Sequence, residues 1–160
     1  MTRSFIRVAI LISVCIHFGN AIEPSIAVEI DPSTNQKSMA LWLAYLLARE
    51  VYHTKHNLPL PASGEILPSF DEEVSARNDT VQIYQELKEK DKQLHESYWE
   101  TLTQVKAKGF MEAYVWTYVR RPDWPKSQQP NNLAAFEIWK NANLKNHQPQ
   151  TVGRLTVQTK

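Results

Sequence analysis

The sequence predicts a single, mostly α-helical domain of four to five helices, one of them long and amphipathic, behind a cleaved N-terminal signal peptide. Three observations predict this fold. A positively charged start precedes an apolar run over residues 8–18, a second apolar run covers residues 39–47, and apolar residues recur at intervals close to three and four from Tyr84 to Val105. The chain has 160 residues, 42% of them hydrophobic, which suits one core.

Residues 1–21 have the layout of a secretory signal peptide. Arg3 and Arg7 precede the apolar run, and Gly19 and Ala21 supply the small residues of a cleavage site. The run is too short to cross a bilayer, so we expect cleavage after Ala21 and no membrane span afterwards. Cleavage also removes Cys15, the single cysteine of the chain. A thiol-free exported domain is typical of the bacterial periplasm, and we expect a periplasmic or secreted protein.

The remaining chain divides into an extended lead-in over residues 22–31, a helical domain over 32–149 and a C-terminal tail over 150–160. Asp31 and Pro32 are a helix-start signal, which predicts a first helix from about Pro32 to Tyr52. Its central residues 39–47 are apolar nearly all round, and this pattern indicates a buried central helix.

Residues 57–68 contain three prolines and a glycine and predict a loop. Ser69 with Glu72 forms a capping box, and Asp79 with Gln82 offers a second start signal. The region is therefore either one bent helix or a short helix followed by a long one of 25–30 residues, ending near Gly109. Asp91 interrupts the apolar spacing of this long amphipathic helix.

Residues 110–119 suit either a helix or a buried strand, and the neighbouring pattern favours a helix. Residues 120–130 contain three prolines and predict a loop. Asn131 or Asn132 then caps a short helix over residues 133–142. The tail after Pro149 is either a short strand or loose chain.

Charge is balanced overall but unevenly distributed. The chain has 18 Lys and Arg against 17 Asp and Glu, which argues against a nucleic-acid binder. Residues 71–100 hold nine acids and four bases, whereas residues 101–160 hold nine bases and three acids. The two regions either pack as complementary neighbours or are each solvated. The third possibility is that the basic C-terminal region provides an electropositive face that steers an acidic partner.

Few residues suggest chemistry, and no cofactor is predicted. Glu50, His53 and His56 follow one another at intervals of three, so neighbouring members of the set are candidate metal ligands. Glu50 and His56 do not share a helical face. The alternative is a pair of exposed histidines at a helix end, where a positive imidazolium is favoured by the dipole.

The most unusual segment is aromatic, basic and proline-rich. Tryptophan and arginine dominate binding hot spots, and two prolines stiffen this loop, so the segment is a candidate protein-binding site. Its candidate contact residues are Arg120, Arg121, Asp123, Trp124 and Lys126. The alternative is that Trp124 folds back as a lid over the helix ends.

These features favour an exported, non-catalytic domain that binds a protein partner in the cell envelope, for example as an inhibitor or immunity-type antagonist of an envelope enzyme. One alternative is a small envelope hydrolase or metal-binding protein that uses Glu50, His53 and nearby acids. Another is a structural assembly protein that pairs through its long helix. The sequence does not specify the oligomeric state.

Overall fold

The computed structural model describes residues 9–12, 25–30, 36–144, 147 and 153–158. Within these residues the chain forms five α-helices, one 3-10 turn and a small antiparallel sheet. The helices are α1 (Gln36–Lys55), α2 (Phe70–Lys90), α3 (Ser97–Ala107), α4 (Met111–Tyr118) and α5 (Leu133–Asn143), with the turn η1 at Lys126–Gln128. The expectation of a mostly helical single domain is confirmed.

The sheet has four strands in the order β1-β2-β4-β3, all antiparallel to their neighbours. The strands are β1 (Ala9–Ile12), β2 (Ser25–Ile30), β3 (Gly64–Glu65) and β4 (Gly153–Gln158). The lead-in therefore contains a strand, and the C-terminal tail contributes the strand that pairs with both β2 and β3. The proposed cleavage site and the Asp31–Pro32 start signal lie outside the described residues.

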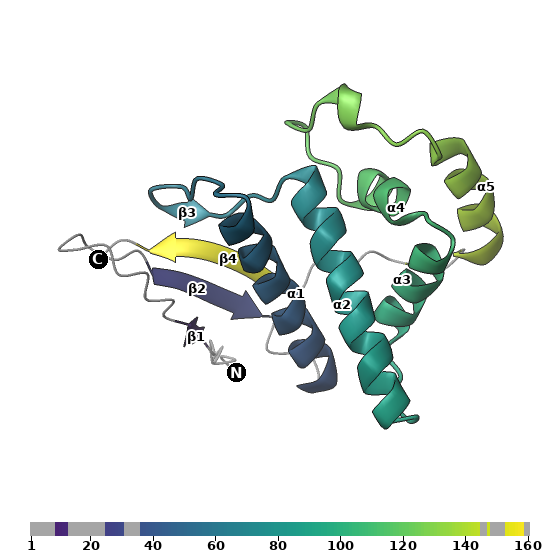
Figure 1. The fold of residues 1–160 in the computed structure, drawn as a ribbon, viewed down its shortest axis with the longest axis horizontal. Helices are drawn as coiled ribbons and strands as arrows, with labels where there is room; N and C mark the ends of the chain where they lie inside the picture. The colour runs from purple at the N-terminus through teal and green to yellow at the C-terminus, as the bar shows by residue number, and fades with distance from the viewer. Residues whose placement is uncertain (1–8, 13–24, 31–35, 145–146, 148–152, 159–160) are drawn as a thin grey trace, which may run out of the picture.

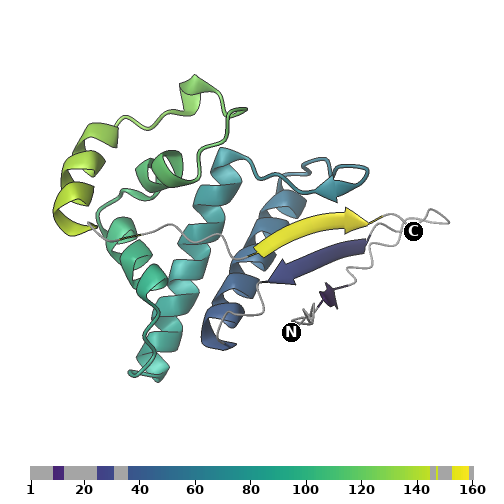
Figure 2. The same ribbon diagram turned by 180° about the vertical axis from the view of Figure 1, so that it is seen from behind.

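Figures 1 and 2 show α1 between the sheet and α2. Helices α1 and α2 run antiparallel side by side, and α3, α4 and α5 lie beyond α2. The core fills the space among these helices. Its largest buried side chains include Trp99, Tyr84, Tyr114, Phe136 and Leu41.

Helix α1 is buried along one face only. Leu47 is 41% exposed and Val51 is 51% exposed. The apolar run therefore overstated the burial of this helix, because part of the run, including Leu47, lies on its outer face. Within the part of the chain that the structure describes, no helix combines the length and hydropathy that a bilayer crossing requires.

The predicted long helix is two helices, which corrects the sequence expectation. Helix α2 begins at the Ser69–Glu72 capping box and runs unbroken past Asp79, so the second start signal is wrong. It ends at Asp91, whose carboxylate accepts a hydrogen bond from the backbone N–H of Gln93 at 3.0 Å. This local hydrogen bond stabilises a turn in competition with the helix.

Within residues 110–119, Met111–Tyr118 form helix α4, as favoured from the sequence. Gly109 has a φ of 69° at the end of α3, a left-handed conformation that glycine adopts without strain. Asn132 is the N-cap of α5, yet its side chain donates to the carbonyl of Gly109 at 3.0 Å instead of capping the helix. This contact joins the start of α5 to the end of α3.

Candidate functional site

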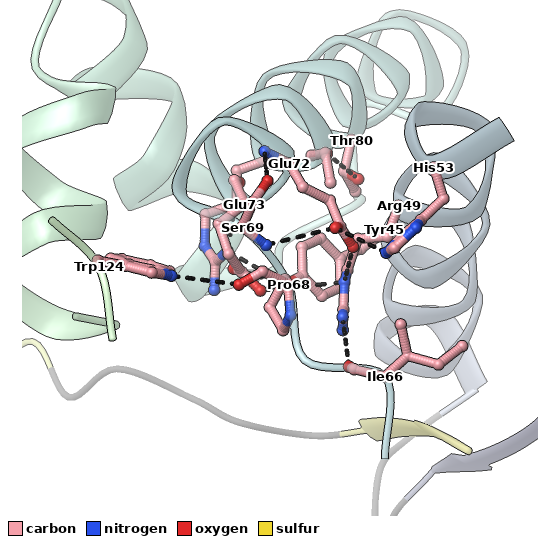
Figure 3. A network of polar contacts seen from close by, with 12 residues as sticks. Tyr45, Arg49, His53, Ile66, Pro68, Ser69, Glu72, Glu73, Thr80 and Trp124 are labelled. Atoms are coloured by element: carbon pink, nitrogen blue, oxygen red, sulfur yellow. Dashed lines mark hydrogen bonds and ion pairs between the residues drawn. The ribbon is translucent and has the colours of Figure 1, made fainter. Parts of the chain in front are cut away.

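A network of ionisable side chains lies buried between α1 and α2 (Figure 3). Helix α1 contributes residues four apart, which therefore follow one face of the helix. Helix α2 contributes residues from its first two turns. We call this set the α1–α2 polar network, and it consists of Tyr45, Arg49, His53, Glu72, Glu73 and Arg77.

Arg49 joins three segments of the chain. Its Nε donates to Oε1 of Glu72 at 2.9 Å, and its Nη2 donates to the main-chain carbonyl of Ile66 at 2.9 Å. The Glu72 side chain is fully buried, with a relative exposure of 0%. The other carboxylate oxygen of Glu72 accepts from the backbone N–H of Ser69, so one residue both caps α2 and binds α1. Figure 3 shows the Arg49 side chain reaching from α1 to both acceptors.

Glu73 is the centre of the second half of the network. The Tyr45 hydroxyl donates to its carboxylate at 2.7 Å, and Arg77 donates to the same carboxylate. Arg77 also donates to the Tyr45 oxygen at 3.1 Å and lies over the Tyr45 ring, 4.9 Å from its centroid. Burial raises the pKa of Tyr45 above its ordinary value, so the hydroxyl remains a donor.

The formal charges of this network cancel, because two arginines face two glutamates. Removing one partner of a buried ion pair leaves an uncompensated charge, and this is far costlier than replacing both partners. The network therefore fixes how α1 and α2 pair. Sliding one helix by a turn would leave these charges without partners.

Of the three candidate metal ligands, His53 is buried, Glu50 is half-buried and His56 is exposed. His53 Nε2 lies 3.0 Å from Glu72 Oε2, although neither ring nitrogen of His53 makes a well-aligned hydrogen bond. His56 instead stacks on the ring of Tyr52 at 4.0 Å. Among residues with described side chains, no group of three or more His, Cys, Asp or Glu is arranged to hold a metal ion.

Glu50 is only half-buried, but its Oε1 is buried without a hydrogen-bond partner. Burial raises the pKa of this carboxyl above its ordinary value, and the opposing effects of His53 and Arg49 are smaller. The carboxyl is therefore held closer to its neutral form than an exposed glutamate.

The loop between α4 and α5 is fixed to the rest of the domain by Trp124. This side chain is only 5% exposed, and its ring packs edge-on against Phe70 with centroids 5.4 Å apart. Its Nε1 donates to the main-chain carbonyl of Pro68 at 3.2 Å, as Figure 3 shows. Trp124 is thus a lid on the helix ends, the alternative considered from the sequence, and its ring is not displayed on the surface.

The charged residues of the same loop are exposed except for Arg121, which is half-buried. Arg120 is exposed, and its guanidinium lies 4.7 Å from the centroid of the Trp116 ring. Arg121 pairs with Asp123 across the turn, with Nε 3.0 Å from Oδ1. Lys126 is exposed at the start of η1. Together these four charged residues of the loop carry a net charge of +2.

The acidic and basic regions do not neutralise one another through ion pairs. Among the described side chains, four acids of residues 71–100 form ion pairs, and their partners belong to α1, α2 or the 91–96 turn: Glu72, Glu73, Asp91 and Glu100. Two bases of residues 101–144, Arg121 and Lys140, pair with acids from within that same region. Arg120 and Lys126 make no ion pair with any described side chain. Lys126 presents its charge to solvent, whereas the exposed Arg120 also contacts the Trp116 ring.

Sequence reasoning missed the polar network. The signal was present, since Tyr45, Arg49 and His53 are spaced by four and cross the end of an apolar run. The acids that face them belong to the predicted capping box and its neighbour. Pairing the two stripes required knowing that α1 and α2 lie antiparallel, which the sequence alone does not specify.

Comparison of the chain with protein-family models, with curated proteins and with solved structures finds no match.

Proposed function

We propose that the protein is exported and acts in the cell envelope as a non-catalytic binding domain. Its partner is a protein with an acidic surface, and its role is that of an inhibitor or immunity-type antagonist of an envelope enzyme. The contact surface is the 120–126 loop, through Arg120, Arg121, Asp123 and Lys126. Trp124 anchors this loop to the domain through its contacts with Pro68 and Phe70.

One observation carries the proposal: a loop fixed by a buried tryptophan displays two cations that have no ion-pair partner in the described structure. A loop held in one conformation loses less entropy on binding than a free one. Exposed positive charge speeds the encounter with an acidic surface and adds specificity. Arginine is also among the residues most enriched at binding hot spots.

The proposal is tested by charge reversal in the loop. The double variant Arg120→Glu/Lys126→Glu is compared with Lys55→Glu/Lys90→Glu, a control that reverses two other exposed lysines. Tagged proteins recover partners from envelope extract, and captured proteins are quantified by mass spectrometry. We expect the loop variant to lose its specific partner by about tenfold or more, since each hot-spot contact is worth over about 1 kcal/mol.

The control should capture the same partner as the unmodified protein. Far-ultraviolet circular dichroism must show the same helix content for all three proteins. Equal capture by the loop variant and the control would refute the loop as the binding surface.

A further inference from the structure

Strand β2 is paired on both edges, and one of its neighbours belongs to the predicted signal peptide. On one side all six residues of Ser25–Ile30 pair with β4. On the other side Ile26, Ala27, Val28 and Glu29 pair with β1. Strand β1 forms the outer edge of the sheet in Figure 1. Cleavage after Ala21 removes β1 and leaves β2 as an edge strand.

We propose that this edge of β2, in the mature chain, pairs antiparallel with β2 of a second copy and joins the two sheets into one. The inference rests on the export and cleavage proposed above. An edge strand presents a row of unpaired N–H and C=O groups, and proteins blunt such edges with lysine, proline or bulges. The segment Ser25–Ile30 contains no lysine, proline or glycine, and Glu29 is its one charged residue.

The register of the sheet defines how two copies meet. Val28 lies opposite Leu155 on one side and Ile10 on the other, and Ile26 likewise has apolar partners, so at these alternate positions apolar residues stand opposite apolar residues. A symmetric pair keeps this rule when Val28 lies opposite Val28 of the second copy. Ile26 then lies opposite Ile30, and Ala27 lies opposite Glu29. A slip by one residue would place Glu29 opposite Ile26 and exchange the two faces of the strand.

A symmetric antiparallel pair is also the simplest closed arrangement, because the same edge serves both copies. It satisfies the backbone groups that β1 satisfies in the uncleaved chain. A single interface of this kind uses the edge of β2 in both copies and leaves no further edge of β2 free.

A single cysteine tests the geometry, because the mature chain has no other. Val28→Cys places two thiols opposite one another at the symmetry axis, where Cα atoms about 4.5–5.5 Å apart allow a disulfide. Ile30→Cys is the matched control, since its two copies would lie about 13 Å apart along the strands. Both precursors are exported in a bacterial host, and the purified mature proteins are oxidised mildly and run on non-reducing gels.

We expect Val28→Cys to give a covalent dimer and Ile30→Cys to stay predominantly monomeric on the gel. A second pair of variants tests, without a cross-link, whether Ala27 lies opposite Glu29 of the second copy. Ala27→Glu sets like charges opposite Glu29 of the second copy, whereas Ala27→Lys sets opposite charges there. Sedimentation equilibrium should show dissociation constants that differ by about tenfold, with the glutamate variant weaker.

The outcomes separate this inference from the proposed function. An N-terminus at Ile22 with a monomer at about 100 μM would overturn the dimer and leave partner binding by the 120–126 loop intact. An intact Met1 on exported protein would overturn cleavage and the dimer together. Equal cross-linking of both cysteine variants, or equal dissociation constants for both Ala27 variants, would overturn the β2–β2 pairing.

Discussion

Replacing Arg49 by methionine tests whether the α1–α2 polar network controls the stability of the domain. Methionine retains a long unbranched side chain but removes the guanidinium. The change breaks the hydrogen bonds to Glu72 and to the carbonyl of Ile66. It leaves the fully buried Glu72 carboxylate facing only His53 and the Ser69 N–H.

The magnitude follows from the burial of this pair. Removing one member of a buried ion pair costs about 3–5 kcal/mol, because the remaining charge has lost its compensation. Small domains have unfolding free energies of about 5–15 kcal/mol, so the loss is a large fraction of the total. In urea, where free energy falls by about 2 kcal/mol per molar, the midpoint should drop by about 2 M.

The double variant Arg49→Met/Glu72→Gln gives the control. It removes both charges and keeps a side-chain oxygen on residue 72 for the capping box. We expect it to recover about 2 kcal/mol relative to the sum of the single changes, because no charge of this pair is left buried. The unfolding free energies of the unmodified protein, Arg49→Met, Glu72→Gln and the double variant are measured by urea unfolding at pH 7. Circular dichroism and tryptophan fluorescence follow the transition. A loss below about 1 kcal/mol for Arg49→Met, or additivity within about 0.5 kcal/mol, would refute the reasoning.

Two further predictions concern Glu50 and Trp124. The raised pKa of Glu50 means that the folded state keeps a proton which the unfolded state releases, so stability falls as pH rises above 4.5. Glu50→Gln should therefore stabilise the domain at pH 7, and the gain should be less than about 1 kcal/mol because water screens a half-buried group. The gain should shrink towards pH 4. Equal urea midpoints of the variant and the unmodified protein at pH 7 would contradict this. Trp124→Phe loses the hydrogen bond to Pro68 and should lower the unfolding free energy by about 1 kcal/mol. Trp124→Ala also loses the ring and should lower it by about 3–5 kcal/mol in thermal or urea unfolding. A loss below about 1 kcal/mol for Trp124→Ala would show that the ring does not anchor the loop to the core.

The capping box shows what local sequence predicts well. Ser69 and Glu72 satisfy the first amides of α2 with their own side chains, so the start of the helix depends on residues three apart. Gly109 is similar, because its left-handed conformation ends α3 whatever lies around it. Such signals involve neighbours in the chain, but they do not always prevail, because α2 runs unbroken through the similar Asp79–Gln82 signal.

The break between α2 and α3 shows why spacing alone is insufficient. Leu87 and Leu94 both fit the helical spacing, yet Leu87 is 42% exposed and Leu94 is buried. The turn over residues 91–96 directs α3 back towards α2, where Tyr84 hydrogen-bonds Glu100 at 3.1 Å. Asp91 was the one polar residue in the spacing, and it is the C-cap of α2.

The loop residues illustrate a different limit. The sequence singled out the 120–126 segment as unusual, but composition does not say which side of a loop faces outward. The carbonyl of Pro68 and the ring of Phe70 determine that Trp124 faces inward. Both acceptor and ring lie more than fifty positions earlier in the chain, and no local pattern records such a pairing.

The short stretch from Ile66 to Pro68 has a mechanical consequence. Two carbonyls separated by one residue hold Arg49 of α1 and Trp124 of the loop, respectively. The path from the loop to the first helix therefore consists of two hydrogen bonds joined by the main chain of residues 66–68. A displacement of this short segment would disturb both contacts at once, so its backbone geometry couples the position of the loop to that of α1.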